Sequence, residues 1–65
     1  MQKGVIRWVH PSGKSGILRV RGGFDLPFDL SDGPGAGAVR PGDHVAFDVV
    51  QTPAGPVAYN LVRRR

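Results

Sequence analysis

The side chains that could carry out acid–base, nucleophilic or metal chemistry are few in this 65-residue sequence. Its histidines are His10 and His44, and it contains no cysteine and no glutamate. Two histidines without such partners make a poor metal site, and neither lies at a recognisable spacing from a serine nucleophile. We therefore expect a binding protein with no metal, no cofactor and no enzymatic activity.

One short motif, Gly13-Lys14-Ser15, looks like the end of the phosphate-binding loop of nucleotide-binding enzymes. That loop needs a glycine five residues before Gly13, where this chain has Trp8, and it needs a helix after the serine. The residues that follow favour a strand instead. We therefore interpret the motif as a turn.

Positive charge is the second chemical feature of the chain. Nine basic residues outnumber five acidic ones, the net charge is +4 and the isoelectric point is near 10.8. This balance indicates a polyanionic partner. Three of the four net charges come from Arg63, Arg64 and Arg65, so the rest of the chain is close to neutral. We expect one domain over residues 1–62 and a basic C-terminal tail over residues 63–65.

Short strands are expected to position these side chains, because the composition opposes helices. The chain has ten glycines, six prolines and no glutamate. Runs of β-branched and aromatic residues, bounded by turn-forming residues, predict the strands. The strands are expected over residues 3–10, 15–21, 24–30, 43–50 and 57–62, with turns at 11–14, 22–23 and 52–56 and a Gly/Pro-rich connection over 31–42.

Alternation within these strands predicts the core. Inward side chains are expected at Gly16, Leu18, Val20, Leu26, Phe28, Leu30, Val45, Phe47 and Val49. Ala46 is expected outward, as is Pro27, which marks an edge or a bulge because it cannot donate to a strand ladder. Five short strands bury an apolar face only if the sheet curls on itself. The sequence therefore predicts a small all-β barrel.

The chain has no feature of a membrane protein. No segment is long and apolar enough to span a bilayer, and no signal-peptide core follows the N-terminus. The absence of cysteine is compatible with the cytosol. We expect a soluble, cytoplasmic protein with no membrane partner.

Five segments have the order and spacing of a known domain. They are Gly4-Val5-Ile6-Arg7-Trp8, Gly16-Ile17-Leu18, Asp25-Leu26 with Ser31, Pro41-Gly42-Asp43-His44-Val45-Ala46-Phe47 and Gly55-Pro56-Val57-Ala58-Tyr59-Asn60-Leu61. With these segments, essentially the whole chain resembles the cold-shock domain, a five-stranded antiparallel barrel of the OB type. The resemblance implies binding of single-stranded RNA or DNA, because members of the family stack bases on aromatic side chains.

Most of the family's stacking aromatics are missing here. The first family motif, Lys-Gly-Phe-Gly-Phe-Ile, reads Gly13-Lys14-Ser15-Gly16-Ile17-Leu18, and the second, Val-Phe-Val-His, reads Leu26-Pro27-Phe28-Asp29. Stacking contributes roughly 1–3 kcal/mol per base, so losing three aromatics would cost ~3–9 kcal/mol of binding free energy. We expect weak binding through an altered surface, with a role in regulating transcription or translation.

The residues expected to contact nucleic acid come from these motifs and from the basic side chains. They are Arg7, Trp8, His10, Lys14, Ile17, Arg19, Asp25, Arg63 and Arg64. The arginines would contact phosphates or stack on bases. Strict alternation places Trp8 inward beside Ile6, whereas the family places it outward. A β-bulge would reconcile the two.

An aliphatic patch supports a second hypothesis of a different class. If Val9, Ile17 and Pro27 are exposed together beside Trp8, they form a patch of the kind that often marks a protein–protein contact. The barrel would then be a protein-interaction module, which binds a protein partner or a second copy of itself in place of nucleic acid.

Overall fold

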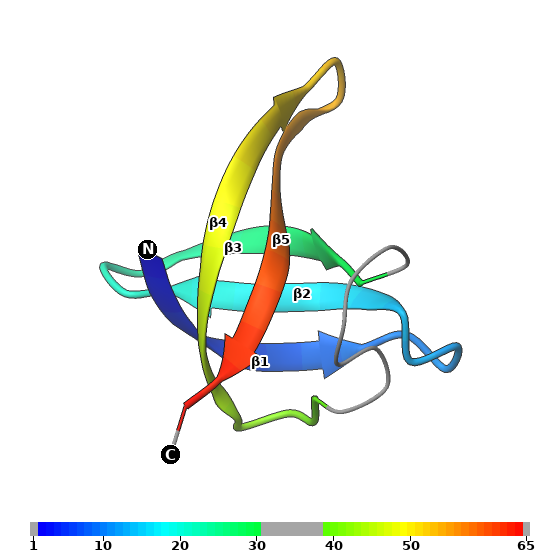
Figure 1. Ribbon diagram of the computed structural model, residues 1–65, viewed down its shortest axis with the longest axis vertical. Helices are drawn as coiled ribbons and strands as arrows, with labels where there is room; N and C mark the ends of the chain where they lie inside the picture. Colours follow the sequence, from blue (N-terminus) through cyan, green and yellow to red (C-terminus); the bar gives the residue numbers. More distant parts are fainter. Residues whose placement is uncertain (1, 31–38, 65) are drawn as a thin grey trace.

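The computed structural model describes residues 2–30 and 39–64, and these residues form five strands and no helix. The strands are β1 (Gln2–Val9), β2 (Ser15–Val20), β3 (Phe24–Asp29), β4 (His44–Thr52) and β5 (Gly55–Arg63). They close into a barrel in the order β1-β2-β3-β5-β4 (Figure 1). The predicted five-stranded all-β barrel is confirmed. Within the described ranges, no helix is present that could cross a membrane.

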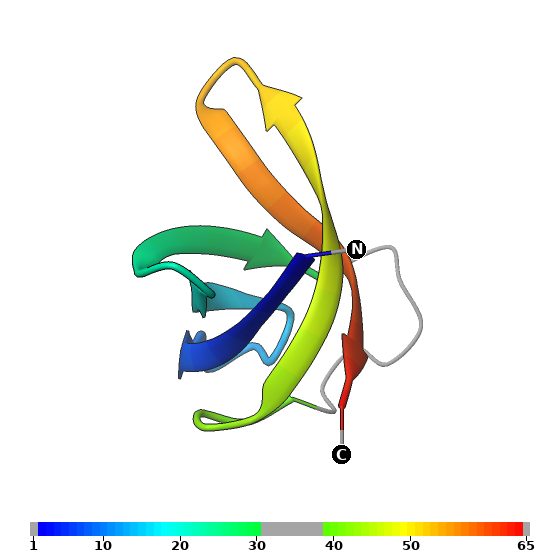
Figure 2. The same cartoon turned by 90° about the vertical axis from the view of Figure 1, so that its left-hand side faces the viewer.

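The strands fall into two groups that cross each other steeply. β1, β2 and β3 run side by side, and the β4–β5 hairpin crosses them and extends beyond them at its tip (Figures 1 and 2). β1 pairs with β4 on one side of the barrel, and β3 pairs with β5 at Phe28 and Ala58 on the other. Four of the five strand pairs are antiparallel as predicted, and the β3–β5 pair that closes the barrel is parallel.

The core occupies the inside of the barrel. Its buried residues are Ile6, Leu18, Val20, Leu26, Phe28, Leu30, Val39, Val45, Phe47, Ala58 and Leu61. Eight of the nine predicted inward positions are buried, and Val49 is half-buried and packs against the core. Ala46, which was expected to face outward, is nevertheless buried, although it is not part of the core cluster. It pairs with Lys3 of β1 and Val62 of β5, so its small side chain lies between longer ones on both sides.

The turn between β4 and β5 is shorter than the predicted range 52–56. Thr52 is the last residue of β4 and Gly55 the first of β5, so two residues connect the strands. The Thr52 hydroxyl donates to the Gly55 carbonyl at 2.6 Å and accepts from the Ala54 N–H at 3.2 Å. Most of the other predicted connection, over residues 31–42, lies outside the described residues.

Gly16 is a point of close packing between the core and the strand backbones. It pairs with Val9 on β1 and with Phe28 on β3. A Cβ atom at this position would lie 2.8 Å from Cε2 and Cζ of Phe28 and would overlap the carbonyl oxygen of Trp8. The missing side chain therefore allows the Phe28 ring to pack directly against the β2 backbone.

We expect Gly16→Ala to destabilise the protein by at least about 1–3 kcal/mol, the usual cost of overpacking a core. The added methyl group fits only if β1 or the Phe28 ring moves. Urea unfolding measures the free energy of unfolding. Ser15→Ala, at the neighbouring half-buried position, is the control and should change it by less than about 0.5 kcal/mol. Equal stability of the two variants would contradict the close packing at Gly16.

Candidate functional site

A β-bulge in β1 sets the direction of Trp8. β1 pairs regularly with β2 up to Ile6, opposite Leu18, and resumes at Trp8, opposite Ile17, so Arg7 is an extra residue. An extra residue re-aims the side chains that follow it. Ile6 is 1% exposed in the core, whereas Trp8 is 51% exposed on the outside. The predicted bulge and the outward direction of Trp8 are both confirmed.

Trp8 begins a row of apolar side chains across the outer face of three strands. Ile17 of β2 is the pairing partner of both Trp8 on β1 and Pro27 on β3. Trp8 and Pro27 are exposed, and Ile17 between them is half-buried. Side chains at paired positions lie on the same face of a sheet, about 5 Å apart. The row of Trp8, Ile17 and Pro27, hereafter the Trp8 row, is therefore a continuous apolar strip.

His10, another predicted site residue, supports one edge of this strip. Its ring meets the indole of Trp8 edge-on, with ring centres 5.8 Å apart and an interplanar angle of 88°. Ser12 holds the imidazole, because its backbone N–H donates to Nδ1 of His10 at 3.0 Å and its hydroxyl oxygen lies 2.9 Å from the same atom. His10 therefore contacts the indole and supports its orientation.

Val9 does not belong to the exposed patch, so this part of the sequence prediction was wrong. Val9 is half-buried and packs against the core. The extra residue Arg7 changes the alternation of β1, and Val9 consequently pairs with the inward-facing Gly16. Among the described residues, the aliphatic surface beside Trp8 therefore consists of Ile17 and Pro27.

An ion pair borders the Trp8 row. Nε of Arg19 on β2 lies 2.9 Å from Oδ1 of its pairing partner Asp25 on β3, and both side chains are about half exposed. The hydrogen bond from Arg19 lowers the pKa of Asp25, and the charges of Arg19 and Arg7 lower it further. The same hydrogen bond raises the pKa of Arg19. These two predicted site residues therefore largely neutralise each other.

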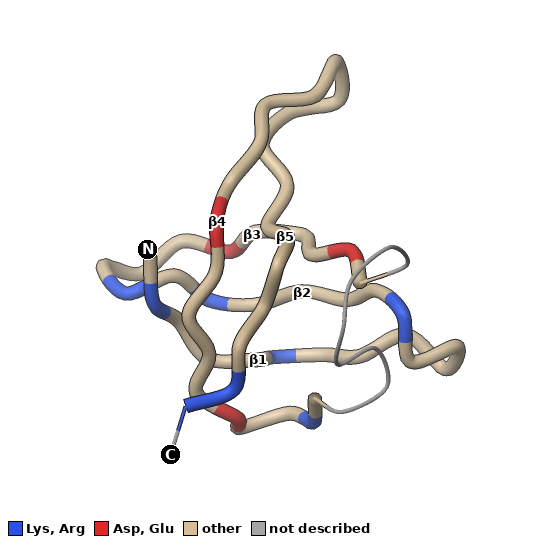
Figure 3. The backbone as a smooth tube through the Cα atoms, viewed as in Figure 1, with Lys and Arg blue, Asp and Glu red and all other residues tan. Residues whose placement is uncertain are grey.

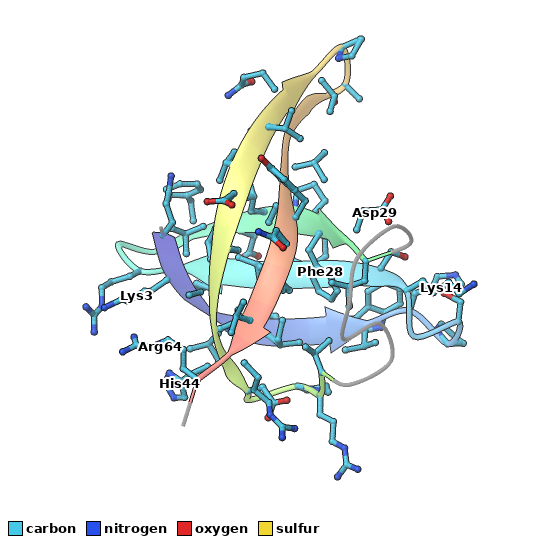
Figure 4. All side chains as sticks on the ribbon, in the orientation of Figure 1. Lys3, Lys14, Phe28, Asp29, His44 and Arg64 are labelled. Carbon is cyan, nitrogen blue, oxygen red and sulfur yellow. The ribbon has the colours of Figure 1, made fainter. Side chains whose placement is uncertain are left out.

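The remaining predicted site residues lie apart from one another. Lys14 lies in the β1–β2 turn, at the opposite end of the barrel from Arg64 (Figure 4). Arg63 is the last residue of β5, so the strand continues into the expected tail. The N–H of Arg64 donates to the carbonyl of His44 at 2.7 Å and extends this pairing. The nine predicted residues therefore do not form one surface.

Lys3 was not among the predicted site residues, although it belongs to the same outer face of the barrel. Its carbonyl accepts the N–H of Arg21 at 2.9 Å, which brings cations of β1 and β2 together. Counting the register back from the Val9–Gly16 pair next to the turn would place Lys3 opposite Gly22, not beside Arg21. The bulge at Arg7 shifts that register by one residue, so simple counting fails.

The chemistry offered by this face is that of binding. Trp8 presents an aromatic face to a planar ring, Ile17 and Pro27 offer apolar contact, and Arg7 offers a guanidinium group. Within residues 2–30 and 39–64, no three His, Cys, Asp or Glu side chains gather into a metal site.

Comparison with known proteins identifies relatives that match nearly the full chain. No protein-family model matches it. The chain is 34% identical over 65 residues to the cold shock protein CspB of Geobacillus stearothermophilus and 34% identical to CspB of Bacillus caldolyticus. It is 32% identical to the cold shock protein CspD of Bacillus subtilis. Each alignment covers 97% of this chain and 98% of the relative.

We expect Arg19→Gln to raise the pKa of Asp25 toward its ordinary value of 3.8, because the Arg19 hydrogen bond is the largest cause of its lowering. Since the folded-state pKa lies below the unfolded one, the pair stabilises the fold above the ordinary pKa. This contribution is lost as the pH falls through the lowered value. NMR titration of the Asp25 carboxyl carbon measures the shift. Arg21→Gln, which removes the same charge without removing that hydrogen bond, should change the pKa less, and equal shifts would contradict the assignment.

Proposed function

The chain belongs to the cold-shock protein family, and on this premise we propose that it binds single-stranded RNA or DNA in the cytoplasm. Family membership also makes it a binding protein and not an enzyme. The observation that carries the proposal is the Trp8 indole, which the bulge at Arg7 turns outward into the row with Ile17 and Pro27. This exposed aromatic side chain supports the proposal, because a base can stack on its face.

Each part of the Trp8 row has a separate task in the proposed binding mode. One base stacks on the indole of Trp8. Such stacking accepts any base, because every base has an aromatic face. The next base lies over Ile17 and Pro27 and gains apolar contact without the contribution of an aromatic ring. Arg7, next to the indole, contacts a phosphate or stacks on a base. The Trp8 row contains one aromatic side chain, whereas the family motifs contain several. This difference supports weak binding through an altered surface.

The Arg19–Asp25 ion pair weakens the electrostatic part of this binding. A phosphate that approaches Arg19 must compete with the carboxylate of Asp25, which already accepts a hydrogen bond from it at 2.9 Å. The negative charge of Asp25 also repels the strand. We propose that weak, reversible binding of this kind suits a regulator of transcription or translation.

A second function, a protein-interaction module, is favoured by one specific observation. Ile17 and Pro27 replace the family's aromatics with aliphatic groups, and together with Trp8 they form an exposed apolar strip. Such a strip suits a protein partner or a second copy of this chain. Because Val9 is half-buried, the exposed apolar strip is smaller than the sequence predicted. A small strip favours nucleic acid over protein as the main ligand.

Trp8→Ala is expected to weaken binding of single-stranded oligonucleotides by about 5- to 150-fold, which corresponds to roughly 1–3 kcal/mol for one stacked base. Fluorescence anisotropy of a labelled oligonucleotide, RNA and DNA in turn, measures the dissociation constant independently of the removed indole. Tyr59→Ala is the matched control, because Tyr59 is an aromatic residue on β5 that is 43% exposed and outside the Trp8 row. Equal losses in the two variants would exclude stacking on Trp8.

Ile17→Asp distinguishes the two functions. If the face binds nucleic acid, the new carboxylate repels phosphates, and the wild-type affinity falls steeply as salt is added. If the face binds protein, the substitution causes a dimer or complex to dissociate, and the stability of that assembly in the wild type depends little on salt. Oligonucleotide titrations at low and moderate salt, combined with sedimentation velocity, measure both. A salt-insensitive dimer lost in Ile17→Asp, without oligonucleotide binding by the wild type, would move the assignment to the protein-interaction module.

A further inference from the structure

A hollow of about 460 Å³ opens on the outer face of the barrel beside the Trp8 row. Its polar lining comes from Lys3, Arg7, Arg19, Arg21, His44 and Arg64, hereafter the basic hollow. Of these, Lys3 and His44 were not expected to bind any ligand, and Arg21 was not among the nine predicted site residues. Figure 3 shows Lys and Arg positions on the neighbouring parts of β1 and β2 and at the end of β5.

Strand pairing brings these residues together from distant parts of the chain. Val5, which lines the hollow, pairs with Arg19 on β2 and with His44 on β4. The Arg21 N–H donates to the Lys3 carbonyl at 2.9 Å, and the Arg64 N–H donates to the His44 carbonyl at 2.7 Å. Lys3, His44 and Arg64 lie along the same side of the barrel in Figure 4.

The shape of the hollow follows from the sizes of its residues. Short residues, Gly4 and Val5, line the hollow together with long cationic side chains from the neighbouring strands. The β2–β3 turn, at Gly22 and Gly23, leaves the rim open, because a Cβ atom on either glycine would meet no atom within 4 Å. An extended ligand can therefore enter from the side.

Four of the five Lys and Arg side chains that line the hollow have no salt-bridge partner among the described residues. Arg19 forms a salt bridge with Asp25, whereas within the described ranges Lys3, Arg7, Arg21 and Arg64 form none. Four cations thus converge on one concavity of a domain whose body is close to neutral. Like charges on neighbouring strands repel one another, and a ligand with several negative charges would relieve that repulsion.

We propose that the basic hollow binds consecutive phosphates of the nucleic acid strand whose bases stack on the Trp8 row, an inference that rests on the proposed function. Arg7 links the two surfaces, because it lines the hollow and directly precedes Trp8. At about 3.3 Å per residue, Lys3 lies roughly 16 Å along β1 from Trp8. The hollow thus extends the binding surface from β1–β3 to the start of β4 and the C-terminal end of β5. Its lining of cations and backbone contacts the strand without reading its sequence.

The first experiment is an NMR titration of the ¹⁵N-labelled protein with oligothymidylates of about 4 to 16 nucleotides, the range of OB-fold sites. The indole N–H of Trp8 reports on stacking, and the amides of Lys3, Gly22 and Gly23 report on the hollow. We expect short oligonucleotides to shift the Trp8 signal and longer ones to shift the amides at the hollow as well.

The second experiment measures the salt dependence of binding of the longest oligonucleotide to Lys3→Gln and Arg21→Gln. Each lost phosphate contact should reduce the log–log salt slope by about 0.7. Arg40→Gln is the matched control, because Arg40 is an exposed cation outside the hollow and its loss changes the net charge equally. We expect the two hollow variants to lower the slope and the control to leave it nearly unchanged.

The combined outcomes separate this inference from the proposed function. If the Trp8 signal shifts while the hollow amides stay silent, and all three variants have equal slopes, the basic hollow is not a phosphate site although the domain still binds nucleic acid. If the hollow amides shift without the Trp8 signal, the phosphate site stands and stacking on Trp8 is refuted. If neither signal shifts, both proposals are wrong.

Discussion

The extra residue at Arg7 lets one strand serve both the core and the outer surface. Before the bulge, Gly4 and Ile6 face inward; after it, Trp8 faces outward and Val9 returns to the core. Without the extra residue, regular alternation would place the indole inside a barrel that is already filled by Phe28 and Phe47. The Trp8 row, its ion-paired border and the adjoining basic hollow all depend on this local change in pairing.

Close packing beneath the outer face supports that surface from the inside of the barrel. Gly16 carries no side chain, so the Phe28 ring fits against β2 directly under the Trp8 row. Phe28 also lies where β3 meets β5 and closes the barrel. The Phe28 ring therefore contributes both to core packing and to the strand pair that closes the barrel. Both support the strands that position Trp8, Ile17 and Pro27.

For the proposed binding of nucleic acid, the distribution of charge over the surface matters more than the net charge. The Arg19–Asp25 pair removes charge from the border of the Trp8 row, while cations without a salt-bridge partner among the described residues gather where β1 meets β2 and β4. On a surface with one exposed tryptophan, this arrangement places stacking and electrostatic attraction on neighbouring areas. A nucleic acid strand that follows β1 would meet both in succession. Most of its attraction would then come from phosphates, independently of sequence.

Alternation and turn chemistry determined the strands, the inward positions and the barrel, because a two-residue period and clusters of glycine and proline are local properties of the chain. The same reasoning placed Leu18, Phe28 and Phe47 in the core. Tertiary structure alone decided the position of Ala46, since its burial depends on pairing with strands from both ends of the chain. It also decided that Val9 leaves the patch and that Lys3, Arg21 and His44 converge. These features depend on strand register, and a single inserted residue shifts that register without any signal in composition or periodicity.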